Sequence, residues 1–219
     1  MIRVKACCNT HHDDLVLCVE EGVDAVGVVV EFPTSVPWSV SRRRAAALIR
    51  EVPPLVTSVA VVGGDADTIL RLAEATGPTA LQLHGDEPED VVAAVRAGLS
   101  GTGIRLIKAL RVGGSAADVA PVGWARLAER FVEAGADAVL LDASSAERAG
   151  GGTGQTIDWS IAGAVSRDCS RPVILAGGLT PDNVVEAART ATPYAVDVVS
   201  SIEDGSHRKV RERVRAFVR

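Results

Sequence analysis

The chain has 219 residues, of which 47% are hydrophobic and 23% charged, and its net charge is −5. This composition excludes intrinsic disorder, and the acidic balance with only 3% aromatic residues argues against a nucleic-acid-binding protein. No apolar run approaches the roughly 20 residues that cross a bilayer, and the first residues lack a signal-peptide core. We therefore expect a cytoplasmic protein with neither nucleic acid nor membrane as a partner.

Eight short apolar runs occur along the chain, and several are continuous rather than alternating, as in AVGVVV. Continuous β-branched runs are typical of parallel strands that are covered on both faces. The predicted strands are residues 2–7, 25–30, 56–62, 79–83, 106–110, 138–141, 173–176 and 195–199.

Segments with helical spacing lie between these runs. Ser41 and Asp65 are candidate N-caps, Gly77 is a candidate C-cap, and the acidic, proline-containing stretch 86–89 and Asp182 begin two further helices. Strand–helix alternation eight times predicts an α/β protein with one (β/α)8 TIM-barrel domain over residues 1–219. An open doubly wound sheet is the alternative, but the GxGxxG fingerprint is absent after the first strand.

In a (β/α)8 barrel the chemistry lies where the strands end, and the first predicted strand ends at Cys7 and Cys8. A thiolate can act as a base or a nucleophile, whereas a buried, unreactive cysteine is the alternative. Adjacent residues of a strand point to opposite sides, so we expect only one of the two thiols at the barrel mouth. A metal site with His11 and His12 is conceivable, but the spacing matches no standard zinc pattern, and we expect no metal.

Three polar residues end two other predicted strands. Gln82 and His84 share one face of their strand, which makes them candidate substrate contacts. Asp142 directly follows AVLL, where a general acid or base is expected, although an Asp could equally cap a turn.

Glycine-rich segments follow the last strands. The stretch 150–159 has Gln155 where the Lys of a P-loop would stand, which disfavours ATP. Gly177 and Gly178 precede a helix and can form an anion nest. Together with the segment 198–205 they occupy the usual phosphate site of this fold, so we predict a small phosphorylated substrate.

The segments KACCNT, QLHGDE, DAVLLDA, GGTGQTIDW, ILAGGLTPDNV and DVVSSIE, in this order, resemble the phosphoribosylanthranilate isomerase family, the tryptophan-pathway barrel. The resemblance implies an Amadori rearrangement of N-(5-phosphoribosyl)anthranilate without a cofactor. Cys7 then matches the general base that removes the C2′ proton, and Asp142 the general acid that protonates the ring oxygen. It further implies pocket positions at Gln82, His84 and Asp197, and a phosphate grip at Gly177, Gly178 and the backbone near Ser200 and Ser201.

The chain departs from this family's pattern in the loops. Cys8 stands where the family has Gly, Val199 and Ser201 replace Ser and Gly, and Pro37 falls at the position of an Arg that contacts the anthranilate carboxylate. These changes leave two alternatives open: a barrel enzyme of the same family that acts on a different small substrate, or a non-catalytic ligand-binding barrel.

Two aromatic residues, Phe32 and Trp38, lie in the loop of the missing Arg, so the pocket there is expected to be more apolar. The sequence leaves open whether the chain is a monomer or a homodimer.

Overall fold

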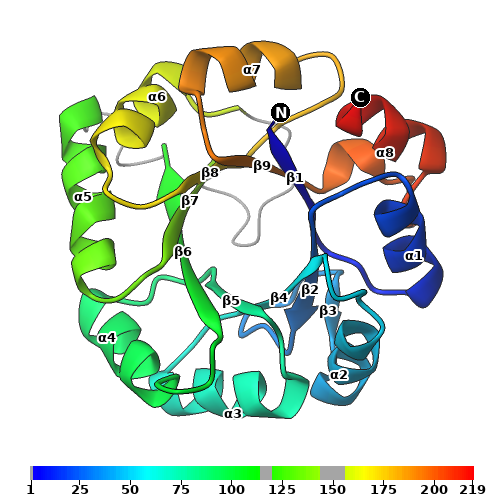
Figure 1. The fold of residues 1–219 in the computed structure, drawn as a ribbon, viewed down its shortest axis with the longest axis horizontal. Helices are drawn as coiled ribbons and strands as arrows, with labels where there is room; N and C mark the ends of the chain where they lie inside the picture. Colours follow the sequence, from blue (N-terminus) through cyan, green and yellow to red (C-terminus); the bar gives the residue numbers. More distant parts are fainter. Residues whose placement is uncertain (1, 114–119, 144–155) are drawn as a thin grey trace.

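The computed structural model describes residues 2–113, 120–143 and 156–219. A ring of parallel strands forms its centre and the helices surround the ring (Figure 1). β1 pairs with both β2 and β9, which closes the sheet into a barrel. The predicted (β/α)8 fold is confirmed, and the open doubly wound sheet is wrong because such a sheet keeps two unpaired edges.

The strands follow the predicted apolar runs closely. They are β1 (Arg3–Ala6), β2 (Ala25–Val30), β3 (Ser39–Val40), β4 (Thr57–Val62), β5 (Ala80–Leu83), β6 (Arg105–Val112), β7 (Ala138–Ala143), β8 (Val173–Leu175) and β9 (Ala195–Val198). The two-residue β3 was not predicted; it pairs only with β2, at the rim, so the other eight strands make the barrel.

In the described residues, eight α-helices and one short 3-10 helix lie between the strands or after the last of them. They are α1 (His12–Glu20), α2 (Arg42–Arg50), α3 (Ala66–Thr76), α4 (Glu89–Gly98), α5 (Pro121–Glu133), α6 (Trp159–Asp168), α7 (Val184–Ala191), η2 (Ser200–Ile202) and α8 (Arg211–Val218). None of these helices is long and apolar enough to cross a membrane.

The predicted helix ends are mostly confirmed. The side chains of Ser41 and Asp65 accept hydrogen bonds from the backbone N–H groups three residues on, and Gly77 takes the left-handed conformation, with φ of 59°. The stretch 86–89 begins α4 as predicted, with Pro88 as the N-cap. One prediction was displaced: α7 begins after Asn183, which leaves Asp182 in the preceding turn.

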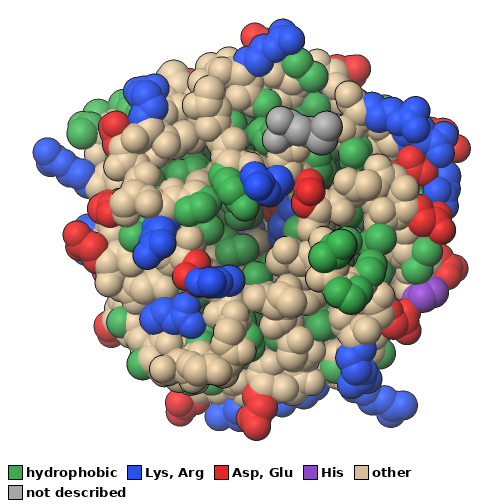
Figure 2. Space-filling view, in the orientation of Figure 1, with side chains coloured by type: hydrophobic (Ala, Val, Ile, Leu, Met, Phe, Trp, Pro, Cys, Tyr) green, Lys and Arg blue, Asp and Glu red, His purple; other side chains and the backbone are tan. Residues whose placement is uncertain are grey.

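Aliphatic side chains fill both layers of the barrel. One cluster lies between the strands and the helices, and a smaller one, with Val59, Ile107, Leu140 and Ile174, fills the interior of the ring. Branched aliphatic residues are the usual filling of such a ring, so the low aromatic content is compatible with the fold. On the face shown in Figure 2, basic and acidic side chains are interspersed around the edge rather than gathered by sign.

Candidate active site

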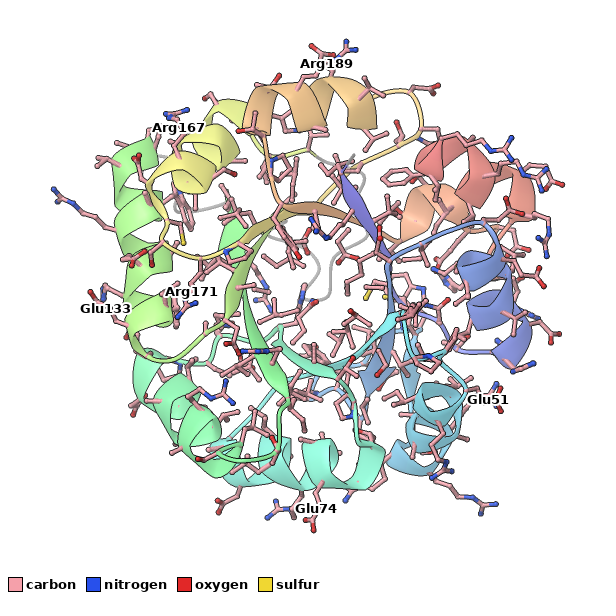
Figure 3. All side chains as sticks on the ribbon, in the orientation of Figure 1. Glu51, Glu74, Glu133, Arg167, Arg171 and Arg189 are labelled. Atoms are coloured by element: carbon pink, nitrogen blue, oxygen red, sulfur yellow. The ribbon has the colours of Figure 1, made fainter. Side chains whose placement is uncertain are left out.

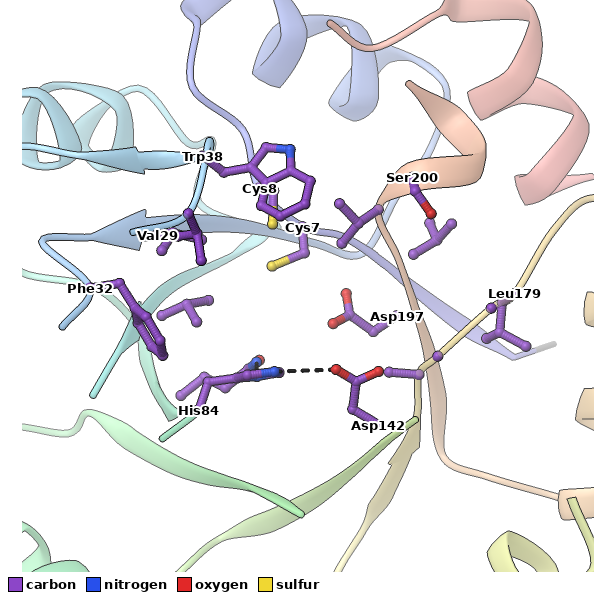
Figure 4. Close-up of a pocket in the computed structure, with 18 residues that line it drawn as sticks. Cys7, Cys8, Val29, Phe32, Trp38, His84, Asp142, Leu179, Asp197 and Ser200 are labelled. Carbon is purple, nitrogen blue, oxygen red and sulfur yellow. Dashed lines mark hydrogen bonds and ion pairs between the residues drawn. The ribbon is translucent and has the colours of Figure 1, made fainter. Parts of the chain in front are cut away.

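A pocket opens where the barrel strands end, and it holds most of the predicted site residues (Figure 4). Its lining consists of Cys7, Cys8, Val29, Phe32, Val36, Trp38, Val61, Gln82, His84, Asp142, Ala176, Gly177, Gly178, Leu179, Asp197, Val198, Val199 and Ser200. The polar groups come from β1, β5, β7 and β9 and the loops that follow them, so the closed barrel brings together residues far apart in the sequence.

The two adjacent cysteines both face this pocket, so the expectation that they point to opposite sides was wrong. The alternation of a strand holds only for extended backbone, and β1 ends at Ala6. Cys8 has φ of 63°, in the left-handed region that favours glycine, which turns its side chain back toward that of Cys7.

The Cys7 thiol has a lowered pKa. A hydrogen bond from the Cys8 thiol lowers the pKa of Cys7 most; burial opposes this, and the positive charge of Lys5 lowers it further. The same contact and burial raise the pKa of the Cys8 thiol well above its usual value. Cys7 is therefore the thiol that is readily ionised, as a base requires, and Cys8 the hydrogen-bond donor.

A chain of hydrogen bonds runs from β5 to β7. Gln82 Nε2 lies 2.8 Å from His84 Nδ1, and His84 Nε2 lies 3.3 Å from Asp142 Oδ2. The predicted shared face of Gln82 and His84 is thus confirmed. If Gln82 donates to Nδ1, the imidazole carries its proton on Nε2 and donates it to Asp142 Oδ2. The chain orients the Asp142 carboxyl toward the pocket, opposite Cys7 (Figure 4).

Asp197 lies between Cys7 and Asp142 in the pocket (Figure 4). Its Oδ2 accepts a hydrogen bond of 2.9 Å from Lys5 Nζ, while burial raises its pKa to about 7 against the opposing charge of Lys5. Asp197 Oδ1 and Gln82 Oε1 are buried and have no hydrogen-bond partner among the described residues. Buried acceptors without partners at a pocket wall are suited to the hydroxyl groups of a ligand.

The glycine-rich loop after β8 and the segment after β9 meet at one end of the pocket. Gly177 and Gly178 have φ of 83° and 62°, and a Cβ on Gly177 would stand 2.5 Å from the Ala143 nitrogen, so only glycine fits there. Ser200 lines the pocket, but Ser201 does not; its Oγ donates to the Leu179 carbonyl oxygen at 2.7 Å. The Ser201 side chain therefore joins the two loops to each other.

Aromatic and aliphatic side chains form the pocket wall opposite the glycine-rich loop. Phe32, Val36 and Trp38 contribute to it, and among the described residues the lining contains no Lys or Arg. The predicted apolar character is confirmed. Pro37, which the sequence placed at the Arg position, faces away from the pocket beside Thr10, so Trp38 is the residue that this part of the loop presents.

The remaining predicted candidates lie elsewhere. His11 and His12 are on the surface, with side chains 46% and 58% exposed, whereas Cys7 is buried, so these groups do not converge. Within the described ranges no group of three or more potential ligands could hold a metal ion. The glycine-rich stretch predicted at 150–159 lies outside the described residues up to position 155.

Three charged residues beneath the pocket were missed by the sequence analysis. Lys5, Glu203 and Lys209 are all buried, and Lys209 Nζ bonds both the Cys7 carbonyl oxygen and Glu203, each at 2.6 Å. Lys5 could have been found, because it lies two residues before Cys7 and alternation places it on the same face. Glu203 and Lys209 carry no such signal, since they connect to the pocket through Trp38 and Cys7, which lie 165 and 202 residues away in the chain.

A closed parallel barrel with a thiol and a carboxyl facing one another across a pocket at the strand ends defines a (β/α)8-barrel enzyme of the acid–base class. The model of the N-(5′-phosphoribosyl)anthranilate (PRA) isomerase family matches residues 4–219, and the chain belongs to this family.

Relatives match over the whole length. The chain is 42% identical over 222 residues to the N-(5′-phosphoribosyl)anthranilate isomerase of Methanopyrus kandleri, covering 100% of this chain and 98% of the relative. The crystal structure of phosphoribosyl anthranilate isomerase from Thermotoga maritima has a TM-score of 0.81 at 32% identity, covering 100% and 97%. A crystal structure of phosphoribosyl anthranilate isomerase in complex with reduced 1-(o-carboxyphenylamino)-1-deoxyribulose 5-phosphate has a TM-score of 0.78 at 30% identity, covering 100% of this chain and 97% of that one.

Proposed function

We propose that this chain, as one domain, isomerises N-(5′-phosphoribosyl)anthranilate to 1-(o-carboxyphenylamino)-1-deoxyribulose 5-phosphate in tryptophan biosynthesis. Family membership over residues 4–219 supports the reaction. The observation that carries the proposal is the pair formed by the Cys7 thiol and the Asp142 carboxyl on opposite sides of one pocket (Figure 4). The reaction needs an acid and a base that act on different atoms of the substrate.

In the first step Asp142 acts as the acid. Its carboxyl proton passes to the ribose ring oxygen, the C1′–O bond breaks, and the nitrogen lone pair forms an iminium at C1′. The hydrogen bond of 3.3 Å from His84 supports this role, because it fixes the direction of the carboxyl and pairs with the carboxylate left behind.

In the second step Cys7 acts as the base. The iminium makes the C2′ hydrogen acidic, the thiolate removes it, and the C2′–H electrons form the C1′–C2′ double bond of an enolamine. The enolamine then loses its O2′ proton and gains one at C1′, which gives the ketose. Atoms balance within the substrate, and the thiol and the carboxylate return to their starting states by proton exchange with solvent.

The rest of the pocket is suited to the two ends of this substrate. Backbone N–H groups of the Gly177–Gly178 loop and of the segment at Ser200 and Ser201 would hold the phosphate. The free acceptors on Gln82 and Asp197 would take the ribose hydroxyls. The apolar wall with Phe32 and Trp38 would pack against the aromatic ring.

The test is the loss of substrate fluorescence with the purified enzyme, together with rescue of a tryptophan auxotroph that lacks this step. We expect Cys7→Ser and Asp142→Asn each to lower kcat by about 10²- to 10⁴-fold, the usual contribution of a positioned acid or base. Cys169→Ser and Asp67→Asn, which lie outside the pocket, serve as matched controls. Dialysis against EDTA should leave the activity unchanged. Absence of turnover by the wild-type chain would contradict the proposal.

A further inference from the structure

We propose that Lys5 is a positioning residue that holds Cys7 in its anionic form by sharing one buried ammonium group between Cys7 and Asp197. This inference rests on the proposed role of Cys7 as the base, and it adds a residue that never touches the reacting atoms.

The position of Lys5 follows from the strand register. Lys5 stands directly beside Asp197 in the parallel pairing of β1 with β9, and the Cys7 N–H continues this pairing by donating to the Val198 carbonyl oxygen at 3.0 Å. This hydrogen bond extends the strand pairing of β1 by one residue, so Lys5 and Cys7 share a face and the Lys5 side chain lies below the thiol, inside the barrel. Both Lys5 and Asp197 are buried, with 3% and 6% of their surface exposed.

Asp197 does not use all the hydrogen-bond donors of Lys5. An ammonium has three donors, and among the described residues only Asp197 accepts a hydrogen bond from Lys5 Nζ. Burial lowers the pKa of Lys5, but the negative charges of Asp197 and Cys7 outweigh it and raise the pKa. The same buried cation favours the ionised form of both acidic groups, although burial still raises the pKa of Asp197 to about 7.

The other charged groups near Cys7 already have partners of their own. His84, which directly follows β5, pairs with Asp142 of β7. Lys209 forms a buried ion pair with Glu203 and reaches only the Cys7 carbonyl oxygen. Cys8 supplies a neutral hydrogen bond rather than a charge. Lys5 is therefore the cation whose removal would be felt most directly at the Cys7 sulfur.

During the proposed reaction, the contact of Lys5 with two acidic groups keeps its charge paired. When Cys7 accepts the C2′ proton it becomes neutral, and Lys5 keeps Asp197 as its single counter-ion. The buried cation is thus never left unpaired, which would be costly in the barrel interior. Before the reaction it stabilises the thiolate without being consumed.

The experiment measures the ionisation of Cys7 directly rather than through turnover. The rate of alkylation by iodoacetamide is followed between pH 5 and 9, and mass-spectrometric fragmentation separates Cys7 from Cys8. In Lys5→Met we expect the midpoint to rise by at least about one pH unit, which is a tenfold slower reaction below it. The acidic limb of kcat/KM should move in the same direction, and Lys5→Arg should restore both.

Two further variants keep the test decisive. Lys5→Met/Asp197→Asn removes both buried charges, so it guards against misfolding of the single variant. Because the Asp197 charge opposes ionisation of Cys7, we expect a midpoint between those of the wild type and Lys5→Met. Arg3→Met, on the same strand but stacked over the exposed Tyr194 ring at 4.2 Å, should leave the midpoint unchanged.

The outcomes separate the two proposals. If Lys5→Met and Lys5→Met/Asp197→Asn are active and keep the wild-type midpoint, the proposed role of Lys5 is overturned and the proposed reaction is not. A raised midpoint in a chain without isomerase activity would uphold the role of Lys5 and overturn the proposed reaction.

Discussion

The place of the Cys7 sulfur is set by a single glycine on the neighbouring strand. A Cβ added to Gly27 of β2 would stand 2.5 Å from the Cys7 sulfur and 3.2 Å from the Cys7 α-carbon. Real side chains do not pack so closely, so the sulfur occupies the space that Gly27 leaves open. The second contact is backbone, and a rotation of the Cys7 side chain alone would not relieve it.

We therefore expect Gly27→Ala to displace Cys7. The kcat/KM for the proposed substrate should fall at least tenfold, while the free energy of unfolding falls by only about 1–3 kcal/mol, the usual cost of overpacking. Urea unfolding and steady-state kinetics measure the two effects. Gly205→Ala is the control, because a Cβ there meets nothing within 4 Å. Full activity of Gly27→Ala would show that the sulfur position is not critical.

At the scale of elements, the loop between β2 and α2 is fixed to the segment that follows β9, on the other side of β1. Trp38 Nε1 donates to Glu203 Oε2 at 3.1 Å, and the ring of His207 meets Trp38 edge-on with centroids 5.1 Å apart. Glu203 is held in turn by Lys209. The aromatic wall of the pocket is thus fixed by contacts with the segment that follows β9.

Trp38→Phe should loosen this wall while keeping an aromatic ring in it. Loss of the indole N–H removes one hydrogen bond from a buried carboxylate, so we expect about 1–3 kcal/mol of destabilisation and a severalfold higher KM with little change in kcat. Trp124→Phe, buried in the helix layer, is the matched control. If both variants raise KM equally, the effect reflects general stability rather than the wall.

At the scale of the whole molecule, ion pairs connect the first helix of the chain, α1, with the last, α8. The two helices lie side by side in Figure 1. The guanidinium groups of Arg211 and Arg215 both bond the Glu21 carboxylate, at 2.7–2.9 Å. Hydrogen bonds from Arg215 and then Arg211 lower the Glu21 pKa to about 2.

The lowered pKa sets the direction of a pH effect on stability. The folded protein keeps Glu21 ionised below the unfolded pKa of about 4.3, so its contribution is complete above that pH and is lost as the pH falls toward 2. We expect Glu21→Gln to flatten the dependence of unfolding free energy on pH between about 4.5 and 2. Glu74→Gln, on the outer face of α3 in Figure 3, is the control and should follow the wild type.

Much of the fold and part of the site could be predicted from local patterns. Short, β-branched apolar runs such as 25–30 favour strands by their length and composition, and the caps at Ser41 and Asp65 act over three residues. The strand ends marked by Cys7, Gln82, His84 and Asp142 lead to one pocket because parallel strands of a closed barrel end at the same rim.

Other features of the site depend on residues far apart in the sequence or on a single backbone angle, and only the tertiary structure decided them. The left-handed Cys8 turns both thiols into the pocket, and the fold makes Trp38 rather than Pro37 its wall. Lys5 meets Asp197 from 192 residues away. Spacing along the chain determined which residues reach the mouth of the barrel, whereas closure of the barrel determined which charges meet beneath it, because a buried charge is stable only beside its counter-ion.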